Sequence, residues 1–306
     1  MDGQVFRYEP PGFRDNDRPP GAYDPVARLA DLDDQGIWAE LMFPSVGLWC
    51  SVIRNPDVAR ECAVIYNDWL HDTFLRVSDR YVGVAMLPVL DVADGVAEVQ
   101  RTVGMGYRAV SIPATPPTPY NDPMYEPLWA AIAEAGVPIT CHVGTGSNPI
   151  TTRGDGGAVI NFVETFFPMQ RTALYLVAAG VFDRYPSMHG VFVEGGAVWL
   201  AALMERMDEA YHYHHEWVRP KMSRKPSDIV RDQVHATFQH DKAVLATLDF
   251  TGPQAVLWGS DYPHHEGTWP DTKDVLADLF DGVAPEVRAA LTGDTFTDLF
   301  GVVAPA

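Results

Sequence analysis

Short apolar runs alternate with longer amphipathic stretches along most of this chain. Seven runs have the length and composition of buried strands, at residues 38–44, 81–89, 107–113, 138–144, 189–195, 234–240 and 255–261. Between them, residues 57–77, 95–103, 125–136, 169–182 and 197–217 place apolar side chains at helical spacing. Strands that alternate with helices pair in parallel through right-handed crossovers. The sequence therefore predicts an α/β fold built on a parallel sheet.

The number of strands narrows the architecture further. Seven strands are one fewer than a closed (β/α)8 barrel contains and many for a simple doubly wound sheet. No glycine-rich phosphate loop follows the first run, which argues against a dinucleotide-binding fold. No internal repeat or linker is visible. We therefore predict an irregular segment over residues 1–25, followed by one domain over residues 26–306.

The charge balance excludes several classes of partner. The chain carries 22 Lys and Arg against 41 Asp and Glu, a net charge of −19, which repels nucleic-acid phosphates and anionic lipid. It contains no apolar run of transmembrane length, and its start lacks a signal-peptide pattern. The three cysteines, Cys50, Cys62 and Cys141, are too few and too irregularly spaced for a disulfide scaffold. These features predict a cytoplasmic protein that acts on a small molecule, without a nucleic-acid or membrane partner.

Polar side chains stand at the ends of four predicted strands, namely His142, Glu194, His240 and Asp261. In a barrel, catalytic groups lie at the carboxyl ends of the strands. A buried, unpaired charge costs several kcal/mol, so buried groups here need a partner or a metal ion. Imidazole and carboxylate are ligands for zinc, iron and manganese. We therefore predict a divalent metal site built from His142, Glu194 and Asp261, whose strand ends are flanked by glycine.

Each of these three residues also has an ordinary structural explanation. A histidine at a strand end, such as His142, is often a satisfied core or rim residue. Glu194 precedes a predicted helix, where a negative charge is favourable. Asp261 has the character of a turn cap before a proline. The metal site and these explanations remain alternatives at this level.

Two further polar sites are better explained without a metal. His240 is read as the start of an ordinary loop. The segment 211–217 is rich in histidine, and His212 and Glu216 share a helix face, but an exposed helix end is the favoured interpretation.

The loop after the last predicted strand, WGSDYPHHEGTWPD, holds more candidate residues. His264 and His265 are placed to bind substrate or to move protons. Trp269 is predicted to form an apolar wall of the substrate site. Arg153, in the glycine-rich loop after residues 138–144, is the candidate cation for a carboxylate substrate.

At these residues the sequence resembles a known family. The segments VPITCHVGTG, VFVEGGAVWLAALMERMDEAY and WGSDYPHHEGTWPD, in this order, are similar to the amidohydrolase-2 branch of the amidohydrolase superfamily. The resemblance covers residues 20–301 and implies a (β/α)8 TIM barrel with one catalytic divalent metal, usually zinc. It implies that His142 is a metal ligand and that Asp261 is a ligand that also orients or deprotonates metal-bound water. Glu194 stands where the family's decarboxylases carry a catalytic histidine, so different acid–base chemistry is expected.

The start of the chain departs from the family pattern. The family opens with a first strand that carries H-x-H or E-x-H, whereas the first histidine here is His71. We therefore expect a missing or atypical first strand, a position that residues 4–10 are candidates to fill. Two lost ligands would weaken metal binding.

These observations predict a metal-dependent hydrolase in which an activated water attacks a small organic substrate. The predicted catalytic residues are Asp261, Glu194 and His264. The alternatives are a catalytically impaired or accessory amidohydrolase-like subunit and a decarboxylase of the same family. The resemblance also implies a homo-oligomer or a complex with a related subunit.

Overall fold

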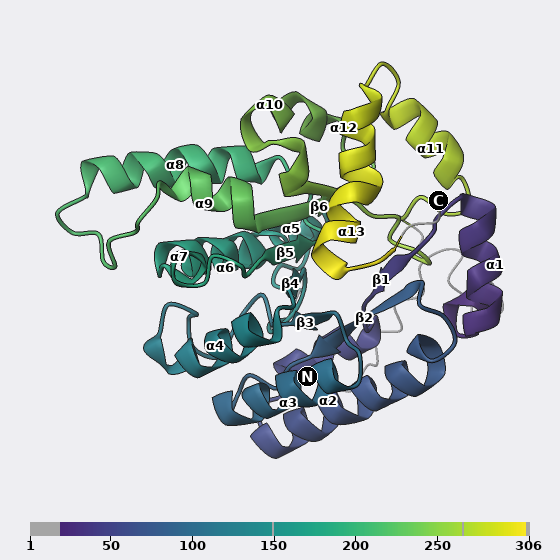
Figure 1. Cartoon of the computed structure of the whole chain (residues 1–306), viewed down its shortest axis with the longest axis horizontal. Helices are drawn as coiled ribbons and strands as arrows, with labels where there is room; N and C mark the ends of the chain where they lie inside the picture. The colour runs from purple at the N-terminus through teal and green to yellow at the C-terminus, as the bar shows by residue number, and fades with distance from the viewer. Residues whose placement is uncertain (1–18, 149, 265, 304–306) are drawn as a thin grey trace.

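The computed structural model describes residues 19–148, 150–264 and 266–303, and of residue 46 it describes the backbone (Figure 1). All seven predicted strands are present, and each lies within its predicted range. They are β1 Glu40–Met42, β2 Tyr81–Met86, β3 Ala109–Ser111, β4 Ile139–His142, β5 Gly190–Val193, β6 Val234–Phe238 and β7 Val256–Trp258. The strands pair in chain order, and every pair is parallel. The predicted α/β fold is confirmed.

Helices connect the strands and cover the outer face of the sheet (Figure 1). The helices of the described residues are α1 Pro25–Gln35, α2 Pro56–Leu70, α3 Val92–Gly104, α4 Glu126–Ala135, α5 Gly157–Glu164, α6 Phe167–Ala178, α7 Val181–Arg184, α8 Trp199–Tyr213, α9 Pro226–Gln233, α10 Leu248–Thr251, α11 Thr272–Leu279, α12 Pro285–Ala289 and α13 Thr295–Phe300. Local sequence sets several boundaries. The Asp24 carboxylate accepts hydrogen bonds from Val26 N and Ala27 N, and Pro25 begins α1.

Three of the predicted helical stretches differ from the observed helices. The stretch 169–182 is divided, because Gly180 adopts a left-handed conformation (φ 69°) that ends α6 and begins α7. The stretch 197–217 is helical only to Tyr213, so the histidine-rich segment lies partly beyond α8. In the stretch 57–77, α2 continues into a π-helical turn, η3, at His71–Leu75.

The core divides into two clusters on opposite faces of the sheet. Along β2, Tyr81 and Ala85 join the large cluster beneath the helices, whereas Val82 and Val84 join a smaller one. This alternation is the two-residue period of a strand that is covered on both faces. The smaller cluster also contains Phe300 of α13, so the C-terminal helix covers the inner face.

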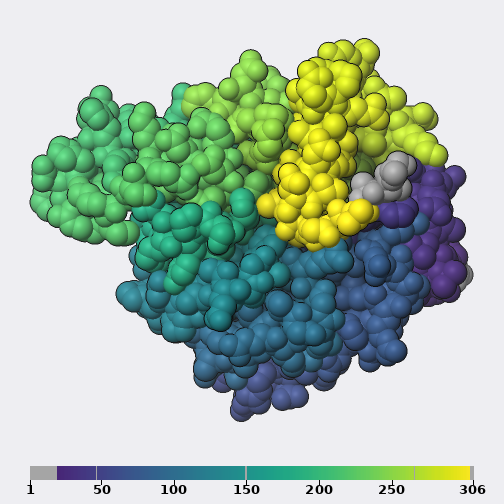
Figure 2. Space-filling model, viewed as in Figure 1, coloured from purple at the N-terminus to yellow at the C-terminus, as the bar shows by residue number. Residues whose placement is uncertain are grey.

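The sheet is an open half-barrel over the described residues. β1 pairs with β2 and β7 pairs with β6, and no pairing between β1 and β7 is described. The end of the chain lies against its N-terminal part, as yellow borders purple in the space-filling view (Figure 2), and the Trp38 indole donates to Val303 O at 3.1 Å. Residues 4–10, the candidates for a first strand, lie outside the described residues.

Helix α1 joins β1 to the loop that follows β7. Arg28 of α1 is buried, pairs with Glu40 of β1 and stacks over the Tyr262 ring at 4.6 Å. The Gln35 side chain accepts a hydrogen bond from Thr272 N at 3.0 Å. These contacts hold the loop after β7 in place beside β1. Among the described residues, no helix combines the length and the apolar character that crossing a membrane requires.

Candidate active site

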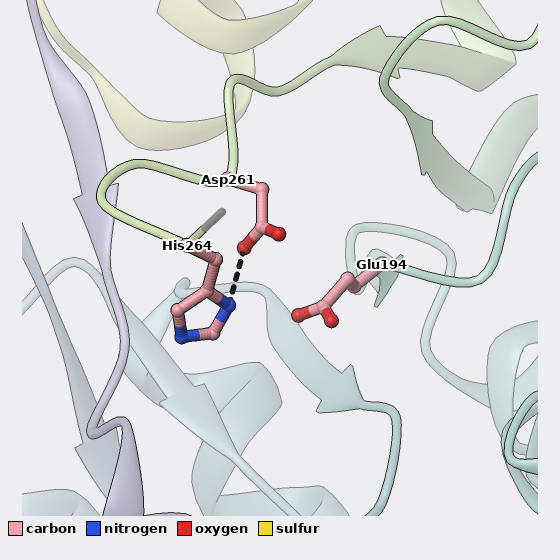
Figure 3. Close-up of side chains that lie close together, drawn as sticks. All are labelled: Glu194, Asp261 and His264. Atoms are coloured by element: carbon pink, nitrogen blue, oxygen red, sulfur yellow. Dashed lines mark ion pairs between the residues drawn. The ribbon is translucent and has the colours of Figure 1, made fainter. Parts of the chain in front are cut away.

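The three predicted metal ligands lie at or just after the carboxyl ends of three parallel strands of the sheet. His142 is the last residue of β4, Glu194 directly follows β5, and Asp261 lies three residues after β7. Figure 3 shows Glu194, Asp261 and His264 pointing toward a common space. Parallel strands end at the same edge of a sheet, which is why residues so far apart in sequence meet here.

The backbone at two of these positions is unusual. Glu194 and Asp261, with φ angles of 67° and 56°, are the described non-glycine residues that have positive φ. Such a conformation costs on the order of 1 kcal/mol or more outside glycine and is retained where surrounding contacts impose it. At Glu194 the backbone N–H donates to Thr237 Oγ1 at 2.8 Å. The left-handed turn lets each chain reverse sharply after its strand and direct a carboxylate into the site.

Gly267 explains how the loop after β7 folds back onto Asp261. A Cβ at this glycine would lie 2.5 Å from Ser260 O and 2.8 Å from Asp261 O. The next residue, Thr268, donates its N–H to Ser260 O at 2.9 Å. Only glycine permits this close approach, so the position of Asp261 depends on it.

The structure brings four candidate residues together. His142 Nε2 lies 2.8 Å from Glu194 Oε2. His264 Nδ1 lies 3.0 Å from Asp261 Oδ1 (Figure 3). One ligand atom each from Glu194, Asp261 and His264 lies within 4.8 Å of the other two. His142 joins this group through Glu194. The cluster therefore combines two imidazoles with two carboxylates.

The donors present suit a divalent cation. Asp261 Oδ2 is buried and has no hydrogen-bond partner among the described residues. A buried carboxylate oxygen is costly to leave unpaired, and a bound cation would satisfy it. His142 Nδ1 lies 3.0 Å from Val143 O, so Nε2, which is paired with Glu194 Oε2, is the ring nitrogen that faces the cluster. Nitrogen and oxygen donors of this kind fit zinc, iron or manganese.

The carboxylates favour positive charge on both imidazoles. The hydrogen bond to Asp261 raises the pKa of His264 to about 9, against the opposing effect of burial. Burial lowers the pKa of His142, but the hydrogen bond and charge of Glu194 outweigh it, and the pKa is raised. The site therefore stabilises cations.

The predicted substrate residues have different surroundings. Trp269 lies in the same loop as His264, and its ring meets the Tyr262 ring edge-on at 5.7 Å. Arg153 is exposed in the segment between β4 and α5. These surroundings do not define a substrate, so the substrate-binding roles of Trp269 and Arg153 stay predictions. His265 lies outside the described residues.

A mainly apolar pocket lies at the carboxyl ends of β2 and β3, and none of the four cluster residues lines it. It is lined by Met86 and Ile112, at the ends of β2 and β3, and by η2 Val46–Val52, and it encloses about 550 Å³ including space open to solvent. Thr145 also lines it and donates its hydroxyl to His142 O at 2.7 Å.

Two residues near the cluster were not predicted. The Phe43 ring lies 5.0 Å from the His142 ring, and Arg54 donates to Gly146 O at 3.3 Å in the turn after His142. Phe43 stands in the first apolar run, where the strand-end rule could have found it. Arg54 lies in a connecting segment that carries no such signal.

The polar sites that were assigned ordinary roles are outside the cluster. His240, His212 and Glu216 are exposed, as expected of a loop start and of an exposed helix end.

Comparisons with known proteins agree with the fold. A family model described as Amidohydrolase matches residues 14–302. The curated gamma-resorcylate decarboxylase of Rhizobium radiobacter is 26% identical over 268 residues, which cover 79% of each chain. A solved amidohydrolase from Mycobacterium avium subsp. paratuberculosis has a TM-score of 0.82 at 22% identity, covering 92% of this chain and 75% of that one.

A second solved structure carries a metal. The 5-carboxyvanillate decarboxylase from Novosphingobium aromaticivorans, with bound manganese and 3-methoxy-4-hydroxy-5-nitrobenzoic acid, has a TM-score of 0.74 at 19% identity. The match covers 90% of this chain and 80% of that one. These structural likenesses establish the shared fold.

Proposed function

The chain belongs to the amidohydrolase family, and from this premise we propose that it is a metal-dependent decarboxylase of a small hydroxylated aromatic carboxylate. The main sequence-based prediction, a hydrolase, is less well supported, because the curated relatives that match are decarboxylases. The observation that carries the proposal is the four-residue cluster of imidazoles and carboxylates at the carboxyl ends of the strands, in a chain related to aromatic decarboxylases.

His142, Glu194 and Asp261 would hold the cation. The ion would supply positive charge that binds and orients an anionic substrate and stabilises charge that develops on it. Zinc was the expected metal, and the manganese in a solved relative makes Mn²⁺ an equally good first choice. Zinc, iron and manganese all suit these donors.

His264 is assigned the role of proton donor to the substrate. Loss of CO2 from an aromatic ring requires that the ring carbon bonded to the carboxylate receives a proton. The Nδ1 atom of His264 is held by Asp261, which leaves Nε2 as the nitrogen that can meet a substrate. Its side chain is 35% exposed, against 9% for His142, so it stands on the open side of the cluster. Asp261 orients the ring through its hydrogen bond to Nδ1.

We also propose that the first strand of the family's barrel is missing or atypical in this chain. The absence of an H-x-H sequence before β1 and the open sheet of the described residues support this. His142, Glu194 and Asp261 would then bind the metal alone and more weakly. This is the observation that favours the second candidate function, an accessory subunit. Location in the cytoplasm and assembly with a like or related subunit stay predictions.

The test is turnover of 2,6-dihydroxybenzoate, a substrate suggested by the relatives, by the protein loaded with Mn²⁺ or Zn²⁺. We expect CO2 release that stops on chelation and returns with metal. The variant His264→Gln should lose about 100-fold or more in kcat, since general acid–base groups contribute about 10²–10⁴-fold. The exposed His212→Gln is the matched control and should keep full activity. Metal binding without turnover of any hydroxybenzoate in a panel would favour the accessory role.

A further inference from the structure

A pair of cysteines lies at the seam between η2 and α2, outside the four-residue cluster. Cys50 belongs to η2 and Cys62 to α2, and both are partly buried free thiols. The two thiols are hydrogen-bonding neighbours. The third cysteine, Cys141, is fully buried in β4 and belongs to the large core cluster. Cys50 and Cys62 therefore differ from Cys141 in both position and accessibility.

The packing of the two elements places Cys62 at this seam independently of the thiol contact. Ala59 and Ala63 of α2 line the same pocket as Cys50. Tyr66, one turn further along α2, lies close to Gly47 of η2. Residues three and four apart share a helix face, so Cys62 lies on the face of α2 that meets η2.

The seam is connected to the segment that follows His142. Ser51, the residue after Cys50, accepts a hydrogen bond on its hydroxyl from Gly146 N at 2.7 Å. Arg54, just beyond η2, donates to Gly146 O. Both contacts tie η2 to the turn after β4, and η2 also lines the pocket. A covalent link between η2 and α2 would therefore restrain one wall of that pocket.

We propose that Cys50 and Cys62 form a reversible intramolecular disulfide, a modification site that reports oxidation by a peroxide. The Cys62 sulfur attacks one peroxide oxygen and the O–O bond breaks, giving a sulfenic acid and one water. The Cys50 sulfur then attacks the Cys62 sulfur, the S–S bond forms, and the hydroxyl leaves as a second water with the Cys50 proton. The two thiols lose two electrons, and the peroxide gains them. A dithiol reverses the reaction.

The order of attack follows from the surroundings of Cys50. Burial and the neighbouring Cys62 thiol raise the pKa of Cys50. Because the thiolate is the nucleophile, Cys50 is the poorer first attacker, and the first attack is assigned to Cys62. The inference does not depend on the proposed decarboxylase function.

Peptide mapping of the full chain tests the proposal. The protein is treated with hydrogen peroxide, alkylated under non-reducing conditions and digested with trypsin, which cuts after Arg54 and Arg60 and so separates the two cysteines. We expect one linked species that joins peptides 29–54 and 61–76 and that dithiothreitol separates. Cys62→Ser should abolish it. Cys141 should stay a free thiol, which serves as the internal control.

Amide hydrogen exchange gives a second measurement that does not use the variant. Exchange over residues 46–55 should slow on oxidation and recover on reduction. Three results would overturn the proposal: separate recovery of both peptides after oxidation, a link that involves Cys141 or a second chain, or unchanged exchange in the linked protein.

Discussion

At the scale of single residues, the site is defined by charge on short side chains that the backbone directs inward. The left-handed conformation of Glu194 and Asp261 places two carboxylates close to two imidazoles. His142, Glu194 and Asp261 could be selected from the sequence because each follows an apolar run. Their mutual contacts could not, since these depend on the turn after each strand and on close packing at Gly267.

Arg54 provides the first prediction at this scale. It is a cation at the turn after His142, in a chain with a net charge of −19. Because the protein is so acidic, an anionic substrate needs local positive charge at the site. Arg54→Gln should therefore raise KM for an aromatic carboxylate about 10-fold and change kcat little. This increase corresponds to the loss of one charge-assisted hydrogen bond. Steady-state kinetics checks this. Arg76→Gln, an exposed residue after η3, is the control, and an equal effect in both variants would refute the role of Arg54.

His235 provides a second prediction, far from the metal ligands. It is buried in β6, its Nδ1 lies 2.8 Å from Gln254 O, and its Nε2 lies 3.0 Å from His189 Nδ1. Burial lowers the pKa of His235 to about 4, and burial also lowers the pKa of His189, against the attraction of Asp232. An unfolded histidine titrates near 6.5, so the unfolded state binds more protons between the two values.

The stability contributed by neutral His235 is present above about pH 6.5 and is lost as the pH falls toward 4. The free energy of unfolding should therefore drop by about 2 kcal/mol from this residue between about pH 7 and pH 5. Urea denaturation at several pH values measures it. His235→Gln should show a shallower pH dependence than the wild type, and an unchanged slope would contradict the argument.

At the scale of elements, the prediction from sequence was strongest for strands. Every apolar run became a parallel strand, because burial on both faces produces a continuous hydrophobic signal. Helix ends were less predictable. Gly180 divides a stretch whose apolar pattern alone looks continuous, and α1, α5 and the helices from α9 to α13 were not predicted. The pocket was also beyond prediction, since it is formed by η2, a segment without regular periodicity, against two strand ends.

The contact between α1 and β1 gives a prediction at this scale. Arg28 and Glu40 form an ion pair whose side chains are 9% and 12% exposed, and Arg28 also contacts the loop after β7. Removing one partner of such a pair leaves an uncompensated charge, which costs about 3 kcal/mol or more. Glu40→Gln should lower the free energy of unfolding by that amount.

The control for this prediction is an exposed pair. Glu209→Gln removes the partner of Arg206, whose side chain is 78% exposed, and should change stability by less than about 0.5 kcal/mol. Equal effects of the two substitutions in chemical denaturation would show that α1 does not hold β1 as the contacts suggest.

At the scale of the whole molecule, the sheet of the described residues is an open half-barrel with carboxylates at the carboxyl ends of its strands. The strand edges of β1 and β7 are bridged by contacts of α1 and by packing of α13 on the inner face. The apolar pattern of an individual strand contains no information about whether the sheet closes. The sequence therefore predicted a barrel whose first strand is missing or atypical. The carboxylates that gather at the open mouth have a cation as their natural partner.

The measurement that tests this account most directly is a Mn²⁺ titration followed by electron paramagnetic resonance, with the wild type beside Asp261→Asn and the exposed control Asp271→Asn. The account predicts saturable binding of about one ion per chain in the wild type and the control, and affinity at least about 10-fold weaker in Asp261→Asn, as expected when a ligand is lost. Equal affinity in all three proteins, or no saturable binding in the wild type, would contradict it.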